Sequence, residues 1–326
     1  MRHNFLSSIL CIVVAAGCSG PVETEVTVPE GRAGAVSFEQ GTEQIQVLID
    51  GRPFATFHYE ETWDKPFLYP LRTASGMVIS RGYPIEPREG EERDHDWHRG
   101  IWYGHGEVNG HDFWRELGRD KTGIIVPISA PTYKATAASA SLTAELGLQT
   151  PKGEIIGTVS EEFAFSKADA LLLIDVTIVI QADKGQALTF GDTEDGGFGM
   201  RLADEFRQDR GATLLNSEGQ KGTENIWGKP ARWIDYATTI EGKQAGVVMF
   251  DHPSNLRHPT RWHARGYSLC AANPFASADF TGDESNDGSY TVKQGDTLTH
   301  RYRVIIHEGE TTPQQIEDLY SQFAGQ

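Results

Sequence analysis

Histidine is concentrated in two short stretches of this 326-residue sequence. The first stretch, Arg93 to Trp114, contains His95, His98, His105 and His111, and the second, Asp251 to His263, contains His252, His258 and His263. Imidazole titrates near working pH, so several histidines among Asp, Glu and Arg in loops offer acid–base catalysis or metal ligation. We therefore expect an active or binding site in these two stretches.

Acid–base roles in this site go to three histidines and one carboxylate. His98 or His105 is the expected base, and His263 or Glu194 is the expected acid. Glu194 belongs to Gly191–Arg201, a glycine-rich stretch that also contains two aspartates. Such a stretch can supply a general acid or bind calcium, but it can equally be a solvated turn.

A metal ion is an alternative occupant of the first stretch. His95 and His98 are three residues apart, a spacing that lets both side chains point one way and bind a metal. His105 is a possible third ligand if Ile101–Gly106 is a strand, and His263 or a carboxylate is the alternative. Arg99, which lies between these residues, would repel a cation unless it points elsewhere. The cofactor is therefore left open, with a divalent metal as one candidate.

Tryptophan, arginine and asparagine near the histidines are typical of a sugar site. An indole covers the apolar face of a sugar ring, and planar polar groups bind its hydroxyls. The tryptophan candidates, about half of which we expect to be structural, are Trp102, Trp114, Trp227, Trp233 and Trp262. The expected substrate-binding residues are His95, Arg99, Trp102, Asn109, Asn255 and Arg261. The two arginines in this set would bind a carboxylate or stabilise an enolate-like charge.

The overall composition is that of an acidic globular protein. Hydrophobic residues make up 38% of the sequence and charged residues 23%, and 29 Lys and Arg against 46 Asp and Glu give a formal net charge of -17. This charge repels the phosphate backbone of nucleic acids and the anionic face of a bilayer. We therefore expect no nucleic-acid partner.

The N-terminus predicts a lipoprotein signal peptide over residues 1–17. Phe5–Ala16 is a mainly apolar run that is too short to span a bilayer, and it follows a positively charged start. Small residues directly before Cys18 resemble a bacterial lipobox, so Cys18 is the expected lipidated N-terminus, with a plain secretory peptide as the alternative. We expect residues 18–33 to form a tether. The predicted location is extracytoplasmic, in the periplasm or at the outer membrane, with membrane attachment only through this lipid.

Cysteine usage excludes two kinds of stabilising site. Removal of residues 1–17 also removes Cys11, which leaves Cys18 and Cys270. If Cys18 is lipidated, Cys270 has no disulfide partner, and a cysteine-based zinc site is excluded as well.

Short apolar or alternating runs dominate the rest of the chain and predict strands. They are Gln44–Ile49, Pro53–Tyr59, Gly123–Pro127, Gly153–Phe165, Leu171–Ile180, Gly246–Phe250 and His300–His307. Leu171–Ile180 begins apolar throughout and then alternates, which predicts a central strand covered on both faces and paired with the run before it. Glycine- and proline-rich segments, including most of the second histidine stretch, are expected to be loops.

One helix is predicted, at the C-terminus. Thr312 is the expected N-cap, Pro313 follows it, and Gln315 completes a capping box. The apolar residues that follow fall on one face of the helix, which indicates packing and not chemistry. We therefore predict a single domain over residues 34–326, a large antiparallel β-sandwich or supersandwich with one C-terminal helix.

The longest motifs resemble a known family. They are Asp94–Arg99, His105–Gly110 with Asp112–Trp114, Glu194–Gly199, Asp251–Asn255 continuing to Arg261–His263, and Ala272–Phe275. Together they resemble a bacterial family of unknown function that carries the label methane oxygenase PmoA, over about residues 40–310. A true methane monooxygenase subunit is an integral membrane protein, and no apolar run of membrane length follows the signal peptide, so we do not expect that activity. Members of the family occur beside sugar oxidoreductases and polysaccharide-degrading enzymes, and the resemblance implies a galactose-mutarotase-like supersandwich.

These observations predict an extracytoplasmic carbohydrate-active enzyme. It would act on a sugar or oligosaccharide by lyase-type or hydrolytic chemistry, with histidine and carboxylate as acid and base. One alternative is a non-catalytic glycan-binding lipoprotein, which needs the tryptophans but not the histidines. The third is a histidine-ligated, metal-dependent oxidoreductase.

Overall fold

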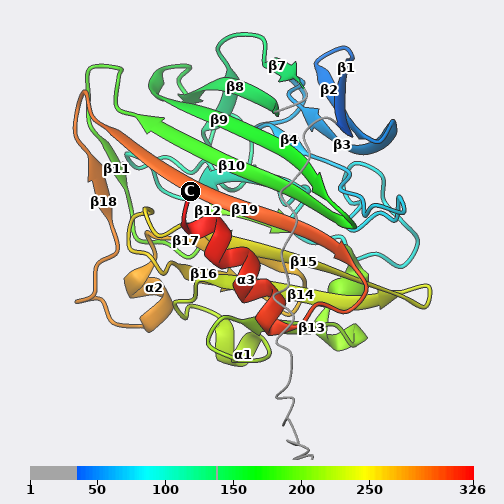
Figure 1. The fold of residues 1–326 in the computed structure, drawn as a ribbon. Coiled ribbons are helices and arrows are strands. Elements are labelled where there is room, and N and C mark those ends of the chain that lie inside the picture. The colour runs from blue at the N-terminus through cyan, green and yellow to red at the C-terminus, as the bar shows by residue number, and fades with distance from the viewer. Residues whose placement is uncertain (1–34, 137–138) are drawn as a thin grey trace, which may run out of the picture.

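The computed structural model describes residues 35–136 and 139–326. Two large antiparallel sheets form most of this range (Figure 1). The predicted signal peptide, the lipidation site Cys18 and the predicted tether lie outside the described residues. In the described part of the chain, no helix has the length and apolar character needed to cross a membrane.

The first sheet has eight strands. In spatial order they are β1 (Val36–Gln40), β2 (Gln44–Ile49), β3 (Arg52–His58), β4 (Phe67–Leu68), β5 (Ile101–His105), β12 (Gly196–Arg201), β17 (Leu269–Asn273) and β16 (Arg261–Ala264). β5, β12 and the β16–β17 hairpin come from segments that are far apart in the sequence, so pairing between them is non-local.

The second sheet has nine strands. Its order is β13 (Thr213–Asn216), β14 (Trp233–Ile240), β15 (Lys243–Asp251), β19 (Thr297–Glu308), β10 (Leu171–Gln181), β9 (Ile155–Ala168), β8 (Ala140–Gln149) and β6 (Ile124–Pro127), with β7 (Thr132–Ala135) also paired to β8. A separate ribbon pairs β11 (Leu188–Phe190) with β18 (Tyr290–Val292).

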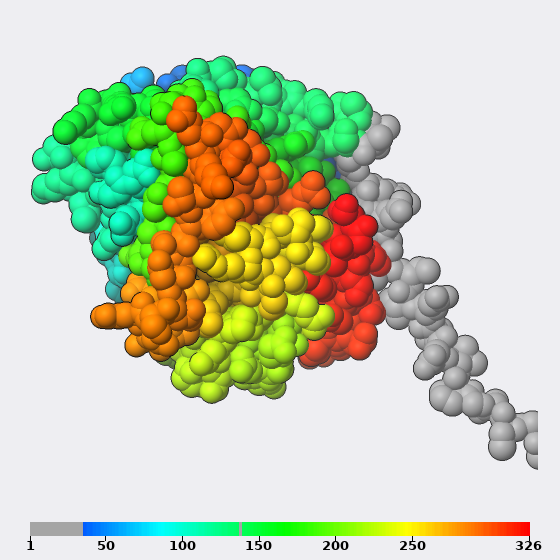
Figure 2. Space-filling model, turned by 90° about the vertical axis from the view of Figure 1, so that its left-hand side faces the viewer, coloured from blue at the N-terminus to red at the C-terminus, as the bar shows by residue number. Residues whose placement is uncertain are grey.

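Three α-helices accompany the sheets in the described residues: α1 (Thr223–Ile226), α2 (Ser277–Thr281) and α3 (Pro313–Ala324). The longest of them, α3, begins with the predicted capping box, since Thr312 and Gln315 each accept a hydrogen bond from the other's backbone N–H. Figure 2 shows α3 (red) and the segment of α2 and β18 (orange) on either side of the yellow segment that contains β15.

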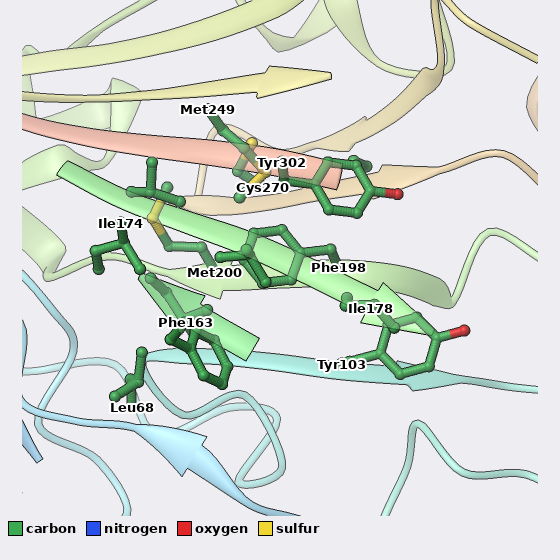
Figure 3. Close-up of a cluster of buried hydrophobic side chains, with 14 of the residues drawn as sticks. Leu68, Tyr103, Phe163, Ile174, Ile178, Phe198, Met200, Met249, Cys270 and Tyr302 are labelled. Atoms are coloured by element: carbon green, nitrogen blue, oxygen red, sulfur yellow. The ribbon is translucent and has the colours of Figure 1, made fainter. Parts of the chain in front are cut away.

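The main core lies between the two sheets. Tyr103, Phe198 and Met200 of the first sheet meet Ile174 and Met249 of the second (Figure 3). Because side chains alternate across a strand, the neighbours of these residues point to the outer faces. The first sheet's outer face has its own small core around Trp102, Trp114 and Ala271.

Helix α3 covers the outer face of the second sheet. Its buried residues pack with Leu173, Phe250 and Ile305 of β10, β15 and β19. This explains why β10 begins as an unbroken apolar run: Leu173 lies under α3, while Leu172 and Ile174 point into the core between the sheets. The prediction of a central strand covered on both faces is confirmed, as is its pairing with β9.

The predicted fold is confirmed: an antiparallel β-sandwich with one long C-terminal helix, and a strand at each of the seven predicted positions. Two expected loops proved to be partly strands. Arg261–Ala264 forms the edge strand β16, because Trp262 points into the core between polar neighbours that point outward. In the glycine-rich stretch, Gly196–Arg201 forms β12, where Gly196 and Gly199 leave room for the large side chains of their partners His105 and Trp102 on β5.

Candidate active site

The outer face of the eight-stranded sheet brings the two histidine stretches together. Trp102, Gly199, Ala271 and His263 are directly opposite one another on β5, β12, β17 and β16 and form one cross-strand row. Directly opposed residues of antiparallel strands share a face. His263 therefore lies on the same face as Trp102, with two small residues between them.

Four aromatic rings form a stacked column on the outer face of the sheet, beginning at Trp102 of this row. The ring of His98 stacks on Trp102 at 5.1 Å and on His95 at 4.8 Å, and His95 in turn stacks on Tyr267 at 5.7 Å between ring centroids. Trp102 and His98 are buried, whereas 38% of the His95 side chain is exposed. The stacked rings therefore run from buried Trp102, next to the sheet, to His95, which is accessible to solvent.

His95 is paired with Asp94. The Nδ1 atom of His95 lies 2.8 Å from Oδ2 of Asp94. The other carboxylate oxygen of Asp94 accepts hydrogen bonds from Nη1 of Arg81 at 2.5 Å and from Nη2 of Arg201 at 2.8 Å. Burial alone would raise the pKa of Asp94, but the His95 hydrogen bond and the two guanidiniums hold it well below its usual range.

This pairing leaves the second nitrogen of His95 available. An ionised aspartate at Nδ1 favours the tautomer with the proton on Nδ1, so Nε2 carries the lone pair. The backbone of His95 has a φ of 42°, in the left-handed region that non-glycine residues rarely adopt. Arg81 Nη2 donates to the carbonyl oxygen of His95 at 2.7 Å and helps to hold this conformation. The arrangement is that of an oriented base.

His98, one of the two predicted bases, is enclosed. Trp97, Trp102 and Trp114 contact its ring, and the residue is 1% exposed. Nη1 of Arg201 lies 3.3 Å from Nδ1 of His98 and donates to it, and burial lowers the pKa of this histidine well below its usual value. The structure therefore gives His98 a packing role behind His95 and does not expose it to substrate.

His105, the other predicted base, points the opposite way. It shares the inner face of β5 with Tyr103, as predicted for a strand, and packs against Phe190 and Phe275 between the sheets. Its Nε2 lies 2.8 Å from the carbonyl oxygen of Gly191, and burial lowers its pKa to about 4. It is separated from the outer-face site by the sheet itself.

The expected metal ligands are consequently not brought together. His95 and His98 lie on the outer side of β5, and His105 lies on its inner side. Within residues 35–136 and 139–326, no group of three or more His, Cys, Asp or Glu side chains is placed to hold a metal ion.

His263, a predicted acid, is fully hydrogen-bonded. Its Nδ1 lies 2.9 Å from the carbonyl oxygen of Glu194, and its Nε2 accepts from Nε of Arg265 at 2.9 Å. Nη2 of Arg265 also donates to the Glu194 carboxylate at 2.9 Å. Burial lowers the pKa of His263 to about 3, so the ring is neutral and has no free proton to give. It positions Arg265, and through Arg265 it positions Glu194.

Asp195 is the carboxylate that remains free. In the described chain its carboxylate accepts no hydrogen bond, and its nearest basic neighbours are Nε of Arg115 at 3.7 Å and Nδ1 of His263 at 3.9 Å. Burial raises the pKa of Asp195, an effect that Arg115 opposes. When His95 is protonated, its charge lowers the pKa of both Asp195 and His263, so its ring lies within electrostatic reach of both. A half-buried carboxylate that accepts no hydrogen bond, on the same face of the sheet as an oriented histidine, is suited to acid–base work.

A pocket of 530 Å³ adjoins this site. It is lined by Arg207, Gln208, Asp209, Thr223, Arg265, Gly266 and Tyr267. Arg265 and Tyr267 therefore border both the pocket and the acid–base residues. The Arg265 guanidinium also lies 4.7 Å from the ring centroid of the partly exposed Trp227, which gives the rim an aromatic surface.

Three predicted substrate-binding residues have structural partners instead. Arg99 is buried, donates to both carboxylate oxygens of Glu116 and lies 4.6 Å from the ring centroid of Trp63. The side chain of Asn109 donates a hydrogen bond to the carbonyl oxygen of Ala187 and accepts one from the backbone N–H of Thr189. The third residue, Asn255, bonds to Asp251 and to the backbone of Arg301.

The remaining candidates divide between the core and other surfaces. Four of the five predicted tryptophans are buried: Trp102, Trp114, Trp233 and Trp262. Trp227 is the partly exposed member of the set.

The residues of the second histidine stretch do not all lie at the site. His252 and His258 contact Phe323 and Tyr320 of α3, on the far side of the molecule from His263. Arg261 lies in a different pocket from Arg265.

Comparison with known proteins assigns a family. A model of a family of unknown function, DUF6807, matches residues 44–321. The chain belongs to this family. The predicted membership of a family of unknown function is thus confirmed, while its PmoA-like label stays a prediction. No curated protein matches the chain.

Solved structures with a similar arrangement have very different sequences. Slr1438 from Synechocystis sp. PCC 6803 is 12% identical, with a TM-score of 0.36, and the match covers 87% of this chain and 98% of that one. A GalM/aldose epimerase homologue from C. elegans is 9% identical, with a TM-score of 0.36 and coverage of 85% and 100%. The GH36 α-galactosidase AgaB from Geobacillus stearothermophilus is 9% identical, with a TM-score of 0.37, and the match spans 85% of this chain but 41% of the enzyme. At these TM-scores the likeness carries no argument about activity.

Several site residues of this DUF6807 chain were not predicted from its sequence. Two of them, Arg265 and Tyr267, come just after the second histidine stretch. The other two, Arg81 and Arg201, are buried and donate hydrogen bonds to the Asp94 carboxylate. Alternation from His263 would have pointed to Arg265 had β16 been predicted as a strand. No signal in the sequence singled out the two buried arginines.

Proposed function

We propose that this protein is a carbohydrate-active enzyme in which His95 is the base and Asp195 the acid. The proposal rests on one observation above all: the imidazole of His95, which pairs with Asp94, and the carboxylate of Asp195, which lies 3.9 Å from His263, share the outer face of the eight-stranded sheet. The predicted base thus moves from His98 or His105 to His95, and the predicted acid from His263 or Glu194 to Asp195.

The proposed chemistry is lyase-type or hydrolytic. In an elimination, Nε2 of His95 takes a proton from the carbon beside a carbonyl or carboxyl group, and the glycosidic C–O bond breaks as protonated Asp195 gives its proton to the leaving oxygen. In hydrolysis, His95 takes a proton from water, whose oxygen bonds to the anomeric carbon as the glycosidic C–O bond breaks and protonated Asp195 gives its proton to the leaving oxygen. The raised pKa of Asp195 favours its role as the acid.

The surroundings support a sugar as the substrate. Trp227 and Tyr267 are partly exposed aromatic residues, and Arg115, Arg265 and Glu194 offer planar polar groups for hydroxyls. The adjoining pocket of 530 Å³ has room for a further part of an oligosaccharide. An extracytoplasmic location and a lipid at Cys18 belong to the same proposal, and mass spectrometry of the N-terminal peptide from the membrane fraction tests them.

The test is a product screen of the mature protein. Uronic-acid-containing, neutral and keto-oligosaccharides are incubated with the protein and analysed by chromatography with mass detection. An unsaturated product indicates elimination, and products that have gained water indicate hydrolysis. Retained binding of an oligosaccharide without turnover would instead favour the glycan-binding lipoprotein.

A further inference from the structure

Two arginines on one edge of the molecule have no acidic partner. Arg257 and Arg261 form no ion pair with any Asp or Glu in the part of the chain that the structure describes. The chain has a formal net charge of -17, with 46 acidic residues, so two arginines without an ion pair that line one pocket make a local positive site on an acidic protein. Asp287, whose pKa responds to the charge of Arg257, is hydrogen-bonded to the backbone and hydroxyl of Ser289 instead.

Both arginines line the same pocket. It has a volume of 220 Å³ and is bounded by Pro230, Arg257, Pro259, Arg261, Pro274 and Ser277. Figure 2 shows the face on which the segments that supply these residues, yellow-green, yellow and orange, adjoin one another. The three prolines give the pocket stiff walls, because their rings fix the backbone φ.

Neutral groups fix the arginines without cancelling their charge. Nη1 of Arg257 donates to the carbonyl oxygens of Pro274 at 2.8 Å and Gly288 at 2.5 Å, and Nη2 donates to that of Ser289 at 3.0 Å. Nη1 of Arg261 donates to the carbonyl oxygen of Gly228 at 2.8 Å. Each guanidinium is therefore held in place and keeps other N–H groups free for a ligand.

We propose that this pocket binds an oxyanion, such as sulfate, phosphate or a carboxylate, between Arg257 and Arg261. Guanidinium groups present paired donors that match the oxygens of these anions. The hydroxyl of Ser277 is a further donor on the same wall. The ligand is either a free anion or the charged substituent of a sugar.

The pocket is distinct from the proposed catalytic residues. Arg261 and His263 share the outer face of β16, but neither His95 nor Asp195 lines this pocket, and neither Arg257 nor Arg261 lines the pocket of Arg265 and Tyr267. Anion binding in this pocket therefore does not depend on the proposed reaction, and loss of turnover in a His95 variant would leave it unaffected.

Calorimetric titration of the mature protein at constant low ionic strength tests the proposal. The probes are sodium sulfate, sodium phosphate and glucuronate, with chloride and neutral glucose as controls. We expect saturable binding of the oxyanions at one site, and at least tenfold weaker binding in the Arg257→Gln, Arg261→Gln double variant. Arg52→Gln, at another exposed arginine without an ion pair, should bind like the wild type.

The outcomes separate the sources of the anion. Tighter binding of glucuronate than of sulfate and phosphate points to a charged sugar, and the reverse points to a free anion. Equal heats from chloride, or unchanged affinity in the double variant, would overturn the proposal. If the double variant unfolds, Arg261→Lys replaces it, and unchanged affinity there would also count against a paired guanidinium contact.

Discussion

Trp102 and His263 lie at the two ends of one cross-strand row, joined by Gly199 and Ala271. This register places the first histidine stretch and the end of the second on one face of the sheet. It also explains why two small residues stand between them, since large side chains at these positions would fill the space above the sheet. The convergence of the two stretches is thus a consequence of strand pairing.

Replacement of His95 should slow turnover strongly and leave the fold intact. His95→Gln removes the base but keeps a planar side chain between His98 and Tyr267, and 38% of the His95 side chain is exposed, so we expect little loss of packing. We expect turnover to slow by about a hundredfold or more, which is the order of magnitude that general base catalysis contributes. Circular dichroism and the urea midpoint should match the wild type, and a variant that turns over substrate at the wild-type rate would contradict the assignment.

Replacement of His98 should instead destabilise the protein. His98→Ala leaves a cavity among three tryptophan rings and removes the acceptor of Arg201. We expect a loss of about 2–4 kcal/mol in the free energy of unfolding, as for other large-to-small changes at buried sites. Urea denaturation measures it, and a midpoint equal to that of the wild type would show that the ring is not packed as described.

The two neighbouring carboxylates should behave differently. Asp195→Asn removes the proposed acid and should lower kcat without lowering stability, because the carboxylate makes no hydrogen bond in the described chain. Glu194→Gln weakens the ion pair with Arg265 and should mainly raise KM. Steady-state kinetics of the two variants separates these effects; a larger fall in kcat for Glu194→Gln would return the acid to Glu194.

Stability should be greatest in the weakly acidic to neutral range. The folded-state pKa of His105 and His300 is lowered by burial to about 4, so stability is full above about pH 6.5, the unfolded value, and is lost as pH falls towards 4. Burial raises the pKa of Glu161 to about 8, so its contribution is full below about pH 4.3 and is lost as pH rises towards 8.

Two variants test this pH dependence. Glu161→Gln should remove the loss between about pH 5 and 8, and His300→Gln should reduce the loss below about pH 6.5, each by a few kcal/mol, since one pKa unit is worth about 1.4 kcal/mol. The measurement is urea denaturation at a series of pH values. A wild-type stability that keeps rising from about pH 6 to 8 would refute the role of Glu161.

Gly199 should not tolerate a larger side chain. A Cβ atom there would lie 2.8 Å from the Trp102 ring and 3.0 Å from Trp114, closer than carbon atoms pack. Gly199→Ala should cost about 1–3 kcal/mol of unfolding free energy, as overpacking does. Gly41→Ala, where the nearest atom would be 3.5 Å away, is the matched control and should change stability little.

The fold was largely predictable because its signals are local. The alternation in Leu171–Gln181 and the capping box at Thr312 depend only on nearby residues, and both were found where they were predicted. Strand β16 was missed because four residues between prolines and a turn carry too little periodicity to be recognised. Local pattern therefore identified seven of the nineteen strands and helix α3 in the described residues, and it missed the remaining elements, among them the short edge strand that carries His263.

The site was less predictable because it depends on which way each side chain faces. His95 and His98 are alike in the sequence, but tertiary packing buries one and exposes the other. The choice between Glu194 and Asp195 depends on Arg265, whose position follows from strand pairing and from His263. Residue types were enough to identify the segments that form the site. The role of each residue within a segment depends on strand pairing and packing, which the sequence alone does not show.

We place catalysis at His95 and Asp195, on the outer face of the eight-stranded sheet. The most direct test is to run the oligosaccharide screen in parallel on the wild type, His95→Gln, Asp195→Asn and His111→Gln, a partly exposed histidine of the same stretch. We predict that the wild type and His111→Gln convert the same oligosaccharide, while the other two fold normally and do not. Full turnover by His95→Gln and Asp195→Asn would contradict this placement.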